Sequence, residues 1–130
     1  MGDSLRFQVP PLTMTTEWPR PDTCLVTLAG ELDMDTAPLL ADYLREQTSS
    51  GPAHLLLDLA GVELIAAAGV NLVVGTLRNE HGIRGQLRII GLPANKVVAR
   101  TLRLTGVDAL LPVHPTADDA LEHLDRVNRN

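Results

Sequence analysis

The 130-residue sequence contains a single cysteine, Cys24, and only three aromatic side chains, Phe7, Trp18 and Tyr43. One cysteine excludes an internal disulfide and a cysteine-rich metal site, and its place in an apolar run predicts a small core residue. So few rings leave no aromatic platform on which nucleic acid bases stack. The core must therefore be built from Leu, Val, Ile and Ala, and a reducing cytoplasm is the expected location.

Positive charge and long apolar runs are also scarce. Eleven Lys and Arg residues against sixteen Asp and Glu residues give a net charge of −5, and the basic residues form no runs. This balance argues against nucleic acid as a partner. No apolar run approaches the roughly 20 residues that cross a bilayer, so no membrane segment is expected. The hydrophobic content of 45% nevertheless predicts a folded domain.

Motifs of the common catalytic and cofactor sites are missing as well. The four histidines are scattered along the chain, and none has a metal-ligand spacing such as H-E-x-x-H. Neither the phosphate-binding motif G-x-x-x-x-G-K-[ST] nor the dinucleotide-binding motif G-x-G-x-x-G occurs. We therefore expect neither enzymatic activity nor a bound metal or cofactor.

The apolar pattern that is present alternates between strand and helix and predicts an α/β fold. Residues 1–11 are expected to form an N-terminal arm, and residues 12–127 a single domain. The first two strands are expected to form a hairpin, with Ala29 and Gly30 ending the second. The nearly continuous apolar run at 54–59 is typical of a central strand buried on both faces. A mixed sheet of about five strands is expected, at residues 12–18, 23–28, 54–59, 87–90 and 110–113.

Four helices are expected to pack against this sheet. Helical spacing places Leu39 on the buried side of the first helix and Val127 on that of the last. A turn at Gly61 is expected between the third strand and the second helix. The predicted starts and stops are Asp35 or Thr36 before the first helix, Gly82 after the second, Pro93 before the third and Thr116 before the fourth.

Three acidic residues, Glu31, Asp33 and Asp35, alternate at the end of the second strand and the entrance to the first helix. Their oxygens suit a cation, although helix capping and solvation are the commoner roles of such residues. A third interpretation is a partner-docking rim, because α/β sheets present binding groups at the carboxyl ends of their strands. The residues alone leave these interpretations open.

The junction between the third strand and the second helix has no hydrogen-bonding side chain. Ser, Thr, Asp or Asn usually caps the unpaired N–H groups at a helix start. Here Ala66, Ala67 and Ala68 occupy those places, before Gly69. The positive end of a helix also suits a phosphate or another anion. A hydroxyl at this junction would be a natural regulatory group, and it is missing.

Three segments carry a resemblance to a known family. They are Gly30-Glu31-Leu32-Asp33 with Thr36-Ala37, Asp58-Leu59-Ala60-Gly61-Val62, and Leu104-Thr105-Gly106-Val107-Asp108. In this order and spacing they resemble the successive motifs of STAS domains, particularly those of bacterial anti-sigma factor antagonists. The resemblance extends from about Thr23 to Leu124 and implies a single STAS domain.

In the antagonists of this family, the corresponding junction resembles Asp-Ser-Ser-Gly or Asp-Ser-Thr-Gly. A serine in it is phosphorylated by the anti-sigma factor, which is itself a kinase, and only the unphosphorylated antagonist binds that factor and frees the sigma factor. The resemblance therefore implies a degenerate phosphorylation site at Ala67 and Ala68. Because a phosphate's charge of about −1.5 to −2 cannot be added there, the usual off-switch is not expected.

The resemblance thus predicts a non-enzymatic regulatory protein that binds an anti-sigma factor of kinase fold and is not phosphorylated at the usual serine. One alternative is a scaffold or decoy that pairs with other STAS proteins or with itself. Another is a ligand-sensing module without a kinase partner, which receives an anion at the helix start. The predicted partner-binding residues are Glu31, Asp33, Asp35, Thr36, Ala66, Ala67, Ala68, Gly69 and Asn71.

Overall fold

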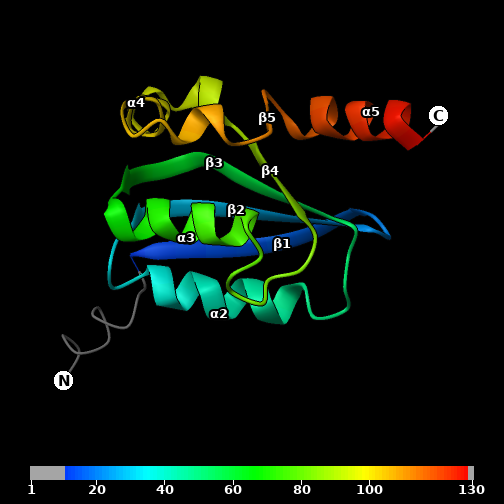
Figure 1. Cartoon of the computed structure of the whole chain (residues 1–130), viewed down its shortest axis with the longest axis horizontal. Helices are drawn as coiled ribbons and strands as arrows, with labels where there is room; N and C mark the ends of the chain where they lie inside the picture. The colour runs from blue at the N-terminus through cyan, green and yellow to red at the C-terminus, as the bar shows by residue number, and fades with distance from the viewer. Residues whose placement is uncertain (1–10, 129–130) are drawn as a thin grey trace, which may run out of the picture.

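The computed structural model describes residues 11–128, so the expected arm at residues 1–11 lies outside the described residues apart from Pro11. Within them, four α-helices flank one sheet of strand order β1-β2-β3-β4-β5 (Figure 1). The strands are β1 (Leu12–Arg20), β2 (Thr23–Leu32), β3 (His54–Ile65), β4 (Gln86–Ile90) and β5 (Val113–His114). The helices are α2 (Ala37–Gln47), α3 (Ala67–Leu77), α4 (Lys96–Leu104) and α5 (Ala117–Asn128).

The predicted α/β class and mixed five-stranded sheet are confirmed. β1 pairs antiparallel with β2 as the expected hairpin, and the remaining neighbours are parallel, which places β3 at the centre. Along β3, Leu55 and Leu57 belong to the main core, and Leu56 packs with Ala120 of α5 in a second cluster. Successive side chains of a strand point to opposite faces, so β3 is buried on both, as its continuous apolar run predicted.

Two glycines that the sequence suggested as stops lie inside strands, so the predicted stop at Gly30 and the predicted turn at Gly61 are wrong. Gly30 has φ +114°, and a Cβ there would lie 1.9 Å from the carbonyl oxygen of Pro11. The N–H of Glu31 donates to that same oxygen at 2.9 Å. The strand register shifts near both glycines, so each absorbs an irregularity and lets its strand continue.

Two helix boundaries also differ from the prediction. α3 ends at Leu77, before Gly82, because the N–H of Glu80 bonds back to the carbonyl of Gly75 at 2.8 Å and closes the last turn. Pro93 lies in a separate 3-10 turn, η1 (Leu92–Ala94), and α4 begins after Asn95. Asn95 supplies the cap, since its side chain accepts from the N–H of Val98 at 3.2 Å.

At α2, β5 and α5, some of the sequence predictions are confirmed and others are wrong. Thr116 caps α5 as expected, because its Oγ1 accepts from the N–H of Asp119 at 3.1 Å. Leu39 and Val127 are about half exposed, so their predicted places on buried faces are wrong. The strand predicted at 110–113 is wrong except at Val113, because the 3-10 turn η2 (Val107–Ala109) and the bend after it delay β5 until Val113.

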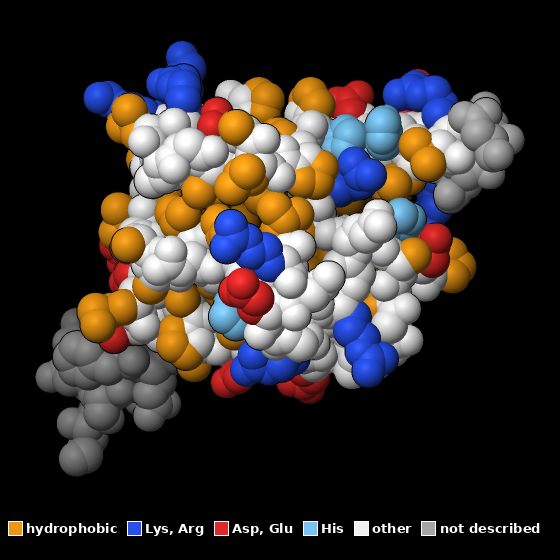
Figure 2. All heavy atoms as spheres, viewed as in Figure 1, with side chains coloured by type: hydrophobic (Ala, Val, Ile, Leu, Met, Phe, Trp, Pro, Cys, Tyr) orange, Lys and Arg blue, Asp and Glu red, His pale blue; other side chains and the backbone are white. Residues whose placement is uncertain are grey.

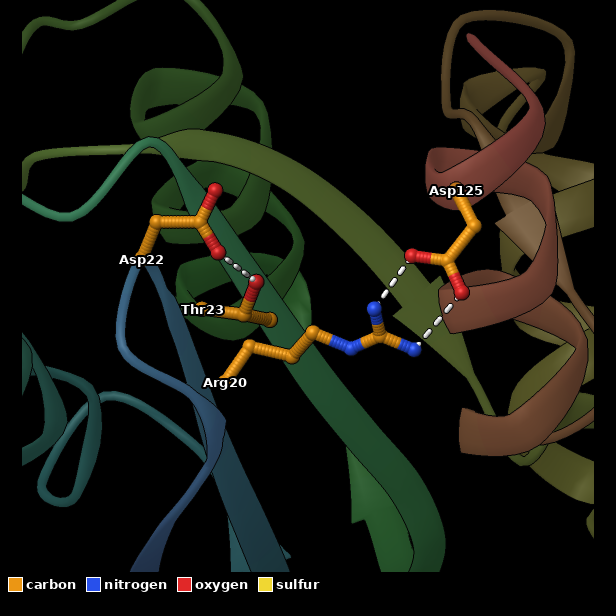
Figure 3. Close-up of polar contacts among 4 residues, drawn as sticks. All are labelled: Arg20, Asp22, Thr23 and Asp125. Carbon is orange, nitrogen blue, oxygen red and sulfur yellow. Dashed lines mark hydrogen bonds and ion pairs between the residues drawn. The ribbon is translucent and has the colours of Figure 1, made fainter. Parts of the chain in front are cut away.

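A pair of charged side chains ties α5 to the β1–β2 hairpin. The guanidinium of Arg20 forms a bidentate salt bridge with the carboxylate of Asp125 (Figure 3). Its Nη1 donates to Oδ1, and its Nη2 donates to Oδ2 at 2.8 Å. The hydrogen bond to Asp125 raises the pKa of Arg20. Asp22, between the two strands, accepts a hydrogen bond from Thr23 in the same view. The last helix is therefore held at both a sheet face and the hairpin end.

Candidate functional site

The acidic turn, defined as Glu31–Thr36, follows β2 and is organised by Asp33. The Oδ1 atom of Asp33 accepts from the N–H of Thr36 at 3.0 Å and from that of Asp35 at 2.9 Å. These two donors, with Thr36 the larger contributor, lower the pKa of Asp33. The carboxylate is therefore charged at neutral pH, and one of its oxygens faces its own turn.

Thr36 lies beneath this turn instead of on its surface. It is 1% exposed, and its hydroxyl donates to the carbonyl of Glu31 at 2.8 Å while accepting from the N–H of Asp33 at 2.9 Å. Thr36 occupies the N-cap position of α2, but its side chain makes no capping bond. The expectation that Asp35 or Thr36 caps this helix with its side chain is wrong, because the N-cap residue is Thr36 and its hydroxyl bonds to the backbone of Glu31 and Asp33 instead.

The alanine tip, defined as Ala66–Gly69, joins β3 to α3. Ala66 is the N-cap residue, with extended backbone angles of φ −95° and ψ 176°, and no side chain caps the helix. Its own N–H donates to the carbonyl of Leu32 at 2.8 Å, and its carbonyl starts the helix by accepting from Val70 at 3.0 Å. Ala67 is exposed, and Ala66 and Ala68 are half-buried. The tip is therefore an apolar surface at the N-terminus of α3, where the helix dipole is positive.

The structure brings the acidic turn and the alanine tip together at the carboxyl ends of β2 and β3. Leu32 pairs with Ile65 at the end of the parallel ladder. Gly69 is buried against them, because a Cβ on it would lie 2.7 Å from Cγ of Leu32 and 3.0 Å from Cγ1 of Ile65. Of the nine predicted contact residues, Thr36 and Gly69 are therefore buried and position the others.

An exposed methionine that the sequence analysis missed lies in the same turn. Met34 is 76% exposed and, with Ala68 and Asn71, lines a groove of about 590 Å³ between α2 and α3. Asn71 itself is exposed and borders this groove from α3. An apolar residue between two acids in a predicted turn is the signal that could have identified Met34. The site therefore combines apolar surface with acidic groups at its edge.

Neither Thr36 nor Thr76 offers an exposed hydroxyl in place of the missing serine, since both are buried. Thr76, the other threonine on the α3 side, is buried, and its Oγ1 donates to the carbonyl of Leu72 at 2.7 Å. Cys24 is fully buried, and burial raises the pKa of its thiol. Across residues 11–128, no three His, Cys, Asp or Glu side chains gather closely enough to hold a metal ion. Every helix in that range is too short or too polar to cross a bilayer.

The sequence and the fold are similar to those of known proteins. The profile of the family described as Mlab, STAS domain, matches residues 17–112, which cover both the acidic turn and the alanine tip. The chain belongs to the STAS domain family. Among its curated relatives is the anti-sigma-F factor antagonist RsfB of Mycobacterium tuberculosis, 29% identical over 75% of this chain and 77% of that protein. Another is the anti-sigma-B factor antagonist of Staphylococcus aureus, 29% identical over 68% of this chain and 81% of that protein.

Solved STAS structures agree with the fold. The crystal structure of an anti-sigma factor antagonist from Mycobacterium paratuberculosis is 31% identical, with a TM-score of 0.69 over 86% of this chain and 92% of that chain. SpoIIAA, an anti-sigma factor antagonist solved in its unphosphorylated form, is 18% identical, with a TM-score of 0.66 over 91% of this chain and 98% of that chain. At that identity SpoIIAA supports the fold alone.

Proposed function

We propose that this STAS domain is a non-enzymatic anti-sigma factor antagonist that binds an anti-sigma factor of kinase fold through the alanine tip and the acidic turn. The observation that carries the proposal is that the tip and the turn lie side by side at the carboxyl ends of β2 and β3. There the N–H of Ala66 donates to the carbonyl of Leu32. Relatives named as anti-sigma factor antagonists support the partner class.

Recognition at this site depends on shape, on exposed backbone and on a charged rim. Ala67 and Met34 offer apolar surface, and Glu31 and Asp35 are exposed acids beside it. The first N–H groups of α3 project from the tip, where no side chain caps them. Asp33 and Thr36 hold the turn in place and are positioning residues, so the partner contacts are their neighbours.

The proposal includes constitutive binding, without phosphorylation at the tip. Ala66, Ala67 and Ala68 carry no hydroxyl, and the hydroxyls of Thr36 and Thr76 are buried and bonded. A kinase that binds this surface therefore finds no hydroxyl at the usual position in the tip. The bound state therefore persists whether or not ATP is present.

Calorimetric titration against the anti-sigma factors of the same organism tests the binding site. Ala67→Asp places a charge at an exposed helix start, which favours the fold because acids stabilise that end. We expect it to weaken binding about tenfold or more by repulsion and desolvation, as a phosphate would. The matched control is Ala53→Asp, the same substitution at an exposed alanine before β3, at the far end of the strand; it should leave affinity unchanged.

Two results would contradict the proposal. If no anti-sigma factor binds the wild-type chain, and light scattering finds a stable oligomer, the scaffold alternative replaces it. If Ala67→Asp and Ala53→Asp weaken binding equally, the tip is not the contact surface. The missing switch has its own test, because Ala66→Asp combined with Ala67→Ser should restore phosphorylation by a partner kinase with ATP, measured by intact mass.

A further inference from the structure

Helix α4 presents a surface that the proposed function does not use. Lys96, Arg100 and Arg103 are exposed on it, together with two large apolar side chains, Val97 at 60% and Leu104 at 72% exposure. Val98 and Leu102 are buried and attach the helix to the core. The exposed face of α4 thus combines positive charge with hydrophobic surface in a chain of net charge −5.

Among residues 11–128, the cations of α4 have no hydrogen-bond or ion-pair partner, unlike most of the others in that range. Arg20, Arg45, Arg84, Arg88 and Arg126 each bond to a carboxylate, a carbonyl or a histidine. Within residues 11–128, the Lys and Arg side chains without a hydrogen-bond or ion-pair partner are Arg78, Lys96, Arg100 and Arg103. Three of these four lie on α4, and Arg78 follows α3 and borders the groove between the two helices.

Helical geometry sorts the exposed side chains of α4 into two adjacent stripes. At about 100° per residue, Val97 and Leu104 lie seven positions apart on nearly the same line. Lys96, Arg100 and Arg103 fall together on the neighbouring line. The apolar stripe lies on the side of Thr101, which borders the groove between α3 and α4.

That groove continues the apolar stripe inward. It has a volume of about 550 Å³, and its apolar lining includes Val70 and Val74 of α3 and Val107 of η2. Ala67 and Asn71 border its other end, so the groove adjoins the proposed anti-sigma factor site. In Figure 2, hydrophobic side chains gather between α3 and α4, and Lys and Arg side chains project outward from the far edge of α4, at the top left. Arg78 and Glu80 border the groove itself, and the cations of α4 lie beyond the apolar stripe of that helix. This arrangement fits a segment whose apolar face covers the groove and the stripe and whose carboxylates reach the cations on the far side.

We propose that the α4 surface, defined as Arg78, Lys96, Val97, Arg100, Arg103 and Leu104, docks an acidic amphipathic segment of a second protein. Charge complementarity favours this occupant, because the four unpaired cations attract carboxylates. The rest of this chain, with a net charge of −5, repels an acidic segment, so the segment is directed to the α4 surface. The hollow favours a protein segment over a flat membrane, since a lipid surface would contact the ridge of α4 and leave the groove unfilled.

The experiment uses the isotopically labelled full chain and a defined probe. The probe is a helical peptide of about 14 residues, close to four turns, with leucines along one face and glutamates elsewhere; a twin peptide carries lysine for every glutamate. We expect the glutamate peptide to shift the amide resonances of α4 and of the groove, and the lysine peptide to shift neither. Anionic vesicles of phosphatidylglycerol and phosphatidylcholine provide the lipid comparison.

Matched variants locate the binding. Arg100→Glu with Arg103→Glu should weaken peptide binding about tenfold or more, whereas Arg45→Glu with Arg126→Glu, which changes net charge equally on α2 and α5, should leave it within about twofold. Leu104→Ser should weaken binding several-fold without changing its dependence on salt, because it removes only apolar contact.

Each contrary result overturns a stated part of the proposal. Equal losses in the two charge-reversed pairs mean that net charge, not α4, attracts the peptide. Vesicle binding that depends on Arg100 and Arg103, with no peptide binding, assigns the surface to lipid. Light scattering that finds an oligomer lost in the α4 variant assigns it to a second copy of the chain. Loss of anti-sigma factor binding in that variant merges the surface with the proposed site.

Discussion

Replacing Asn95 with Ala removes a side chain that joins α4 to the strand leading into the alanine tip. Asn95 is 8% exposed. Its Nδ2 donates to the carbonyl of Leu59 at 2.8 Å and to that of Val62 at 2.6 Å, and its Oδ1 accepts from the N–H of Val98 at 3.2 Å. One side chain therefore caps a helix and pairs two carbonyls of β3.

The expected loss is worked from these three bonds, since the fourth, from Nδ2 to the carbonyl of Ala60, is the longest at 3.4 Å. An Ala at an N-cap that held Asn costs about 1 kcal/mol. Each of the two carbonyl oxygens that loses its donor adds about 1 kcal/mol, because the net value of a buried hydrogen bond is of that order. We expect Asn95→Ala to lower the free energy of unfolding by about 3 kcal/mol, a large share of the roughly 5–15 kcal/mol of a typical domain.

Urea unfolding followed by circular dichroism measures this loss, and a second variant separates its causes. Asn95→Asp keeps the acceptor for Val98 but turns an oxygen toward the two carbonyls, so at neutral pH it should be at least as destabilised as the Ala variant. The control is Asn71→Ala, at an exposed position, with an expected change within about 0.5 kcal/mol. A loss below about 1 kcal/mol for Asn95→Ala, or wild-type stability for Asn95→Asp, would refute this account.

Three further changes have directions set by the structure. Gly30→Ala should destabilise the chain by more than about 2 kcal/mol, because a Cβ would overlap a backbone oxygen at a φ of +114°. Gly106→Ala, with open space and a φ of +76° near the left-handed helical region, should cost only about 1 kcal/mol by thermal unfolding. Burial lowers the pKa of His114 below its usual 6.5. The unfolded chain then binds more protons, so stability from this group is present above that value and falls as the pH drops, and His114→Gln should remove that part of the slope. Coupling between Arg20 and Asp125, from a double-mutant cycle, should shrink as salt is raised, because both side chains are partly exposed.

The central elements could be predicted from sequence because one physical rule dominates them. A strand covered on both faces must be apolar at every position, and Leu55, Leu56 and Leu57 meet that rule. The cap at Thr116 was equally local, since Asp119 lies one helical turn away and the bond joins near neighbours. Such features need no knowledge of distant partners.

The missed features depend on residues far apart in the sequence. Gly30 resembles a turn residue, but its φ is required by the close approach of Pro11, which belongs to the neighbouring strand's entry. Asn95 resembles a loop residue, yet its amide is used by carbonyls more than thirty positions earlier. The acidic turn was located correctly, but the burial of Thr36 depends on how Glu31 and Asp33 fold over it.

The position of the alanine tip does not depend on a hydroxyl group. The start of α3 is fixed by the bond from Ala66 to Leu32 and by the contact of Gly69 with Leu32, neither of which uses a hydroxyl. A missing cap costs about 1 kcal/mol. The hydrogen-bonded pairing of β2 with β3 holds the tip in place without that contribution. Because backbone and packing set the position of the tip, alanines can replace hydroxyl residues without moving it. Under the proposed function, the contact surface would thus be kept although the hydroxyl that a kinase modifies is absent.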